Sequence, residues 1–233
     1  MFCKTVFPSI PDQAIAKMVA GVDVDLFRPD DELKRLARKA VDSGVAEAFS
    51  AGDVDATCEI LKSSADGQEW IASFQESAEP WFNFSTGSGF YHRDKIWIEN
   101  IEVPFEFIRS YIENLKDGKD LNRPVEAIRA ERDRVVNEYI EFLETDEDRE
   151  AFQGKLGLAR TVFPYVENHN FYVEHWAHSV IWRKMRELGA IMVDQGFWEK
   201  PDDIFYLKRV EVEEMLWDYF VSWATPEAPA GPG

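Results

Sequence analysis

The sequence has few of the residues that build disulfide frameworks or zinc sites. Its 233 residues include two cysteines, Cys3 and Cys58, which form no Cys-x-x-Cys pair. Disulfide scaffolds and zinc ribbons need several cysteines at set spacings, so both classes are excluded. The opening stretch MFCKTVFPSIPDQ has no basic region followed by an apolar one, so no secretion signal is indicated. A cytoplasmic protein is therefore expected.

Long hydrophobic runs and excess positive charge are also missing. Charged residues interrupt every apolar stretch before the roughly 20 residues that a membrane-spanning helix needs. The chain has 26 Lys and Arg against 44 Asp and Glu, a formal net charge of -18. This charge repels nucleic acid phosphates and anionic lipid, so we expect no nucleic acid partner and no membrane association.

Hydrophobic residues make up 45% of the chain and aromatic residues 14%, enough to fill a sizeable core. Strand and helix patterns do not alternate, which argues against a doubly wound sheet. Apolar residues recur instead at three- and four-residue spacing, as in Leu33, Leu36, Ala37, Ala40 and Val41. The sequence predicts a mostly α, multi-helix domain with long C-terminal helices.

Helix-capping and helix-breaking residues predict where several helices begin and end. Ser9 is available to cap a first helix, and Gly118 closes another that starts near residue 104. A long helix is expected from Pro124 to about residue 152, because proline suits the first helical position. Residues 156–195 carry the strongest helical pattern, and a last helix is expected near 210–223.

Helical periodicity disappears between residues 79 and 104, where Thr86, Gly87, Ser88 and Gly89 separate two aromatic runs. We expect an ordered aromatic and glycine-rich loop, or a small β-hairpin, near residues 81–103. The amides of STGSGFYHRDK suit an anion, and a turn without a ligand is an equal alternative. The segment is not a Walker loop, because Gly-x-x-x-x-Gly-Lys-Ser/Thr is absent.

These patterns suggest three regions: short helices in residues 1–78, a helical substrate-binding region in 79–224, and a flexible tail or linker in 225–233. One continuous domain is the alternative. The tail contains proline, alanine and glycine but no large side chain. Such a composition is typical of linkers and frayed termini.

The segment FYVEHWAHSVIWRKMRELG, residues 171–189, concentrates polar and aromatic side chains within one expected helix. Histidine can act as acid, base or ligand near neutral pH, and arginine can hold a phosphoryl oxygen. An aromatic core with hydrogen-bonded histidines is an equal alternative. Steps of three and four residues place six side chains on one face: Asn168, Tyr172, His175, Ser179, Trp182 and Arg186.

A metal centre is not expected here. Helical carboxylate-bridged metal sites use Glu-x-x-His motifs on two helices, whereas Glu174 and His178 are four residues apart and no second copy follows. A metal-binding helical enzyme therefore remains the less favoured alternative. No Gly-x-Ser-x-Gly elbow and no dinucleotide fingerprint are present either.

Residues 160–215 resemble the helical acceptor-substrate region of phosphotransferases related to phosphoenolpyruvate synthase. The matching outline is Glu167-Asn168, Tyr172, Arg183 or Arg186, Leu188-Gly189, Gly196 and the run from Pro201 to Leu207. Within these PEP-utilizing enzymes, the large subunit of phenylphosphate synthase-type enzymes is most similar, and rifampicin phosphotransferases are more distant. The earlier stretch FNFSTGSGFYHRDKIWI also looks like the phenylphosphate synthase group.

The resemblance implies a relay in which ATP phosphorylates a histidine on a swivelling domain, which then delivers phosphate to a bound hydroxyl. The carrier histidine of the family lies in a Gly-rich Thr/Ser-His-x-Ala segment, and none of the four histidines here has that context. The nucleotide-binding ATP-grasp module is absent as well. We therefore expect an acceptor-binding domain that is not catalytically complete alone. It is either cut from a longer subunit or works with separate nucleotide and carrier parts, which supply ATP and Mg²⁺.

An aromatic, phenolic substrate would suit such a domain, because aromatic walls bind rings by stacking and burial. His175 or His92 would act as the base, and Arg186, Arg183 or Arg93 would neutralise the phosphoryl group. The remaining substrate-binding residues expected are Tyr91, Trp97, Glu167, Asn168, Tyr172, Trp176 and Trp182. A non-catalytic helical interaction module is the rival hypothesis.

Overall fold

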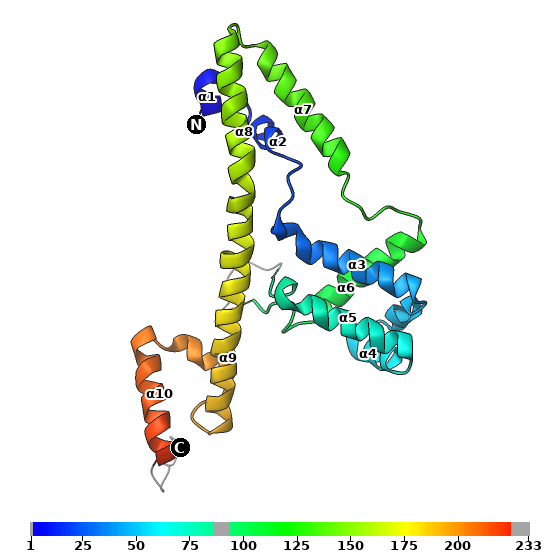
Figure 1. Cartoon of the computed structure of the whole chain (residues 1–233). Coiled ribbons are helices and arrows are strands. Elements are labelled where there is room, and N and C mark those ends of the chain that lie inside the picture. Colours follow the sequence, from blue (N-terminus) through cyan, green and yellow to red (C-terminus); the bar gives the residue numbers. More distant parts are fainter. Residues whose placement is uncertain (1, 86–93, 225–233) are drawn as a thin grey trace.

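A computed structural model of the chain describes residues 2–85 and 94–224, and all regular structure in these residues is helical (Figure 1). The mostly α prediction is confirmed. The elements in chain order are α1 (Phe2–Val6), α2 (Asp12–Met18), η1 (Asp25–Phe27), α3 (Arg28–Asp42), η2 (Ala46–Ala51), α4 (Val54–Lys62), α5 (Ala65–Trp81), α6 (Glu102–Lys116), α7 (Val125–Glu141), α8 (Asp146–His169), η3 (Asn170–Ala177), α9 (His178–Asp194), η4 (Pro201–Tyr206) and α10 (Arg209–Ala224).

Helices α3 to α6 pack around an aromatic core. Trp70 is fully buried, and its ring lies 5.0 Å from that of Phe49 and 5.8 Å from that of Phe105. Its indole nitrogen donates a hydrogen bond to the carbonyl of Leu36 over 2.9 Å, so the polar edge of the ring is satisfied inside the core. The predicted apolar face of residues 33–40 is buried here, whereas Val41 remains exposed.

The helices α8, η3 and α9 form one continuous rod from Asp146 to Asp194 (Figure 1). At 1.5 Å per residue it is roughly 70 Å long. A second core joins α2, α7 and the start of α8 through Ile10, Met18, Val135, Val136, Leu143 and Phe152. Each of the two cores contains residues from distant parts of the sequence. The boundary between the predicted regions 1–78 and 79–224 stays a prediction.

Two predicted helix boundaries are wrong. The helix expected from Pro124 to residue 152 is two helices, because the chain turns after Glu141 and Thr145 caps α8 by accepting a bond from the amide of Asp148. The cap of α2 is Pro11 and not Ser9. The last helix does lie where the sequence places it.

Short 3-10 helix η4 packs closely against α9. A Cβ atom on Gly189 would lie 2.1 Å from the carbonyl oxygen of Pro201, so only glycine permits this approach. Ile204 is buried in the contact. Helix α10 follows and stands beside α9, at the end of the rod opposite to α1 (Figure 1).

The segment between α5 and α6 is an irregular loop, without a β-strand in its described residues 82–85 and 94–101. Two backbone hydrogen bonds, from the amide of Trp97 to the carbonyl of Phe84 and from Ile98 to Phe82, give it the start of a hairpin ladder. The described residues thus show no strand of the expected hairpin, and the glycine-rich part of the expected loop, residues 86–93, lies outside the described residues. Across the described residues, no helix is long and apolar enough to cross a membrane.

Candidate functional site

The centre of the rod has an unusual backbone. Residues Asn170–Ala177, which include most of the FYVEHWAH motif, form a π-helix with bonds from residue i+5 to residue i. A π segment shifts the register of one α-helix against the next, and such segments are frequent at functional sites. Spacing rules for an α-helix therefore do not hold across residues 168–178.

The six residues expected on one face nevertheless contact the rest of the molecule in succession along the rod. The side chain of Asn168 accepts a hydrogen bond from the amide of Asp25 at 2.8 Å. Burial, followed by a hydrogen bond to Asp25, raises the pKa of Tyr172. The other contacts are made by His175 and Ser179 with the loop after α5, by Arg186 with Glu99, and by Trp182 with Phe205 of η4.

His175 is half-buried against the loop. Its ring lies 4.5 Å from the ring of Phe84 at an angle of 36°. Burial lowers the pKa of the imidazole, with a smaller opposing effect from Glu174. The hydroxyl of Ser179 lies 2.5 Å from the carbonyl oxygen of His175 and 3.1 Å from that of Asn83, which ties the rod to the loop. A neutral imidazole at pH 7 is what a general base requires.

Two arginines of α9 pair with acidic residues, one with Glu99 of the loop and the other with Glu79 near the end of α5. Arg186 donates to both carboxylate oxygens of Glu99 at 3.2 and 3.0 Å, and these side chains are 13% and 17% exposed. The guanidinium also lies 3.5 Å from Asp202 and 5.4 Å from the ring centroid of Phe205. Arg183 bonds Glu79 at 3.0 Å. Both arginines are thus already engaged with carboxylates.

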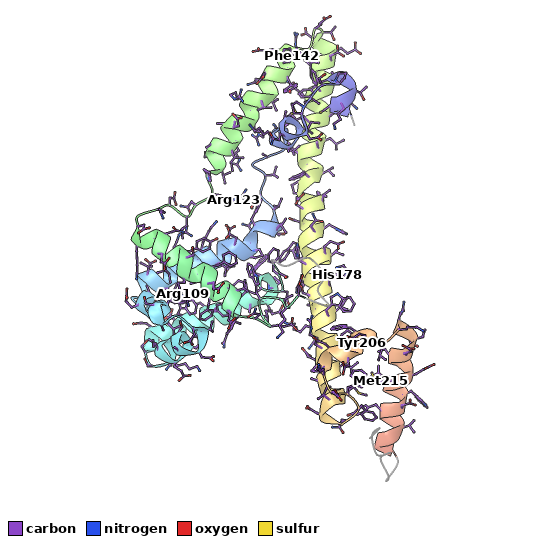
Figure 2. The ribbon with its side chains drawn as sticks, turned by 180° about the vertical axis from the view of Figure 1, so that it is seen from behind. Arg109, Arg123, Phe142, His178, Tyr206 and Met215 are labelled. Carbon is purple, nitrogen blue, oxygen red and sulfur yellow. The ribbon has the colours of Figure 1, made fainter. Side chains whose placement is uncertain are left out.

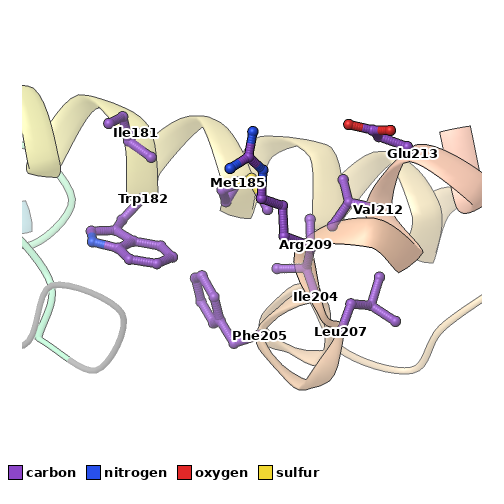
Figure 3. Close-up of a pocket in the computed structure, with 9 residues that line it drawn as sticks. All are labelled: Ile181, Trp182, Met185, Ile204, Phe205, Leu207, Arg209, Val212 and Glu213. Atoms are coloured by element: carbon purple, nitrogen blue, oxygen red, sulfur yellow. The ribbon is translucent and has the colours of Figure 1, made fainter.

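An apolar groove opens beside this network, between α9, η4 and the start of α10 (Figure 3). Its volume is about 610 Å³. Trp182 and Phe205 meet edge to face at 5.5 Å on one wall. The groove is lined by Ile181, Trp182, Met185, Ile204, Phe205, Leu207, Arg209, Val212 and Glu213, of which only Arg209 and Glu213 are charged.

Of the residues predicted from sequence, Trp182 lines the groove and Arg186 borders it through Phe205. His175, Arg183, Tyr172, Trp176, Glu167 and Asn168 lie elsewhere on the rod, outside the lining. Trp97 is buried among Phe82, Phe84 and Phe107. Tyr91, His92 and Arg93 lie outside the described residues.

Sequence reasoning missed Phe205, Arg209 and Glu213 as lining residues. Phe205 belongs to the run from Pro201 to Leu207, so the motif itself was a signal. The two charged residues come from α10, whose placement beside α9 has no signal in local spacing. Within residues 2–85 and 94–224, no group of three or more His, Cys, Asp or Glu side chains is placed to hold a metal ion.

Comparison with known proteins gives one distant relationship. No protein-family model matches the chain, and no solved structure matches it. The uncharacterized phosphotransferase YvkC of Bacillus subtilis (strain 168) is 21% identical over 123 residues, which cover 53% of this chain. The match spans only 14% of the length of that protein. The chain is thus distantly similar to part of a phosphotransferase.

Proposed function

We propose that this chain is the acceptor-binding part of an ATP-dependent, phosphohistidine-relay phosphotransferase, and that its groove holds an aromatic substrate carrying a phenolic hydroxyl. The observation that carries the proposal is the groove itself. It is large, mainly apolar and walled by two aromatic rings, with few polar groups at its edge. Small-molecule sites usually combine these properties. The distant similarity to a phosphotransferase supports the reaction class.

The chemistry requires a cation near the transferring phosphoryl group. Arg209 is exposed, lines the groove and forms no ion pair among the described residues, so it suits this role. Arg186 then acts indirectly, by holding Glu99, Asp202 and Phe205 in place. His175 remains the proposed base. Because His175 lies outside the lining of the groove, the substrate has to extend from the groove toward the loop for its hydroxyl to reach the imidazole.

Binding can be tested by calorimetric titration of the chain with phenol and 2-naphthol. Replacing Trp182 or Phe205 by alanine should weaken binding roughly tenfold or more, because each removes an aromatic wall. Trp217→Ala, which changes an exposed tryptophan outside the groove, is the matched control. Absence of saturable binding to the folded chain would contradict the proposal.

Turnover can be tested by reconstitution with ATP, Mg²⁺ and the nucleotide-binding and carrier proteins, with phosphorylated aromatic product as the readout. Arg209→Ala should lower kcat/KM, whereas Arg209→Lys should retain part of it. Incorporation of phosphate from ATP by this chain alone would refute the assignment of an acceptor-binding part. Unchanged turnover in His175→Gln would remove His175 from the proposed mechanism.

A further inference from the structure

Helix α10 has a second apolar surface, formed by side chains outside the lining of the groove, with the groove residue Glu213 at one edge. Val212 lines the groove, and the ring of Tyr219 lies 6.3 Å from Phe197, so these residues mark the inner side. With 3.6 residues per turn, Val210, Trp217 and Val221 fall on the opposite side, with Phe220 next to them. We call these four residues the outer face of α10.

The outer face exposes an unusual amount of aromatic surface. Trp217 is 66% exposed and Phe220 is 65% exposed, and their rings lie 6.1 Å apart. Val210 is also largely exposed. Adjacent exposed aromatic side chains are uncommon on a solvated helix and are typical of anchor residues in protein interfaces. This surface therefore has the composition of a docking site.

Acidic residues border the outer face. Helical spacing places Glu214 and Asp218 along one side of Val210, Trp217 and Val221. Both are exposed, and neither forms an ion pair among the residues that the structure describes. Lysine or arginine residues on a partner would satisfy these carboxylates, whereas acidic residues would be repelled.

A second copy of the chain fits this border poorly. A parallel pair of outer faces would bring Glu214 against Glu214, and an antiparallel pair centred on the face would bring Asp218 close to Glu214. Like charges in direct opposition destabilise helix pairs. Residues 225–233 of the same chain contain no basic residue and no large apolar side chain, so they offer neither kind of contact.

We propose that the outer face of α10 binds a basic amphipathic helix of another polypeptide. The apolar side of that helix packs on Trp217 and Phe220, and its lysine or arginine residues pair with Glu214 and Asp218. This is helix-on-helix recognition with electrostatic selection of the partner. None of the four residues of the outer face lines the groove, so the proposal does not depend on the function proposed for the groove.

The test uses the full chain and two labelled helical peptides of about 18 residues, with leucine at heptad positions a and d. One peptide carries lysine beside the leucines and the other carries glutamate. Fluorescence anisotropy should show binding of the basic peptide and at least roughly tenfold weaker binding of the acidic one. Binding of the basic peptide should weaken as salt is added.

Variants then locate the surface. Trp217→Ala with Phe220→Ala should weaken binding of the basic peptide by roughly tenfold or more. Tyr206→Ala removes an aromatic ring that is 88% exposed on η4 and should leave binding unchanged. Glu214→Lys with Asp218→Lys should reverse the preference, so that the acidic peptide binds better. Circular dichroism verifies that each variant keeps its helices.

Three outcomes would overturn the proposal. One is equal binding of both peptides, or of neither, to the unmodified chain. Another is a charge-reversed variant that still prefers the basic peptide. The third is a concentration-dependent dimer in sedimentation that is lost in the Trp217→Ala, Phe220→Ala variant, which would assign the outer face to a second copy.

Discussion

Gly189 sets how closely η4 approaches the rod. A Cβ atom at this position would overlap the backbone of Pro201, which cannot move without displacing the whole of η4. We expect Gly189→Ala to lower the free energy of unfolding by about 2 to 4 kcal/mol, measured by urea denaturation.

Gly157 provides the matched control for this substitution. It also lies inside a helix of the rod, but nothing comes within 4 Å of a Cβ atom built there. Gly157→Ala should therefore stabilise the chain by about 0.5 to 1 kcal/mol through helix propensity alone. Equal stability of the Gly189→Ala variant and the unmodified chain would show that the contact with Pro201 is not close.

His175 gives stability a dependence on pH. Because burial lowers the pKa of His175 below its ordinary value of 6.5, the folded state binds protons less readily than the unfolded state there. The stability associated with neutral His175 is fully present above the unfolded pKa of 6.5. It is lost as the pH falls from 6.5 through the lower pKa of the folded state. Between pH 7.5 and 5.5, the free energy of unfolding should fall more for the unmodified chain than for His175→Gln. His169→Gln, at an exposed position, should behave like the unmodified chain.

Individual contacts of the rod were only partly predictable. The spacing of Asn168, His175, Trp182 and Arg186 indicated a polar and aromatic face, and these residues do contact other elements. Their partners come from segments far away in the sequence, as Glu99 does for Arg186. Local spacing contains no information on such pairs, so the engagement of Arg186 with two carboxylates was not foreseen.

At the scale of elements, Arg186 connects three of them: α9, the loop before α6, and η4. Removing it leaves the carboxylate of Glu99 poorly solvated and without this guanidinium. We expect Arg186→Ala to lower the free energy of unfolding by about 1 to 3 kcal/mol.

A double-mutant cycle with Glu99→Ala tests this pairing directly. If the two side chains act mainly on each other, the double variant should be more stable than the sum of the single effects implies, by roughly 1 kcal/mol. Strict additivity would mean that the contact contributes little. Lys184→Ala, at an exposed pair with Glu187, should change stability by less than about 0.5 kcal/mol.

Element types were more predictable than their junctions. Leu33, Leu36, Ala37 and Ala40 have the period of an amphipathic helix, and α3 buries them. The π segment was not foreseen, because Asn170–Ala177 has no composition that distinguishes a π-helix from an α-helix. The segment runs directly from α8 into α9, so no capping or helix-breaking residue marks its two ends.

The whole molecule is extended, because the rod from Asp146 to Asp194 carries its packed helices on different sides and at different heights (Figures 1 and 2). Phe142 lies near one end of the rod, and Tyr206 and Met215 lie toward the other (Figure 2).

A compact chain of this length has a radius of gyration of roughly 17 Å. Small-angle X-ray scattering at several concentrations should give a clearly larger value, together with a pair-distance distribution that tails toward long distances. A concentration-independent value near 17 Å would be incompatible with the extended rod.

The overall shape could not be predicted from the sequence. Val135 and Phe152 can be recognised as apolar, but the sequence does not indicate which helix covers them.

The π segment also lies between two helical arms of the rod, α8 and α9. The α9 arm extends roughly 25 Å beyond it and carries η4 and the groove. A bend of about 10° at Asn170–Ala177 therefore displaces the far end of this arm by roughly 4 Å, more than the length of a hydrogen bond. A pivot of this size at the aromatic motif would change the position of the groove, and it would also have to move or break the contacts that Ser179 and Arg186 make with the loop.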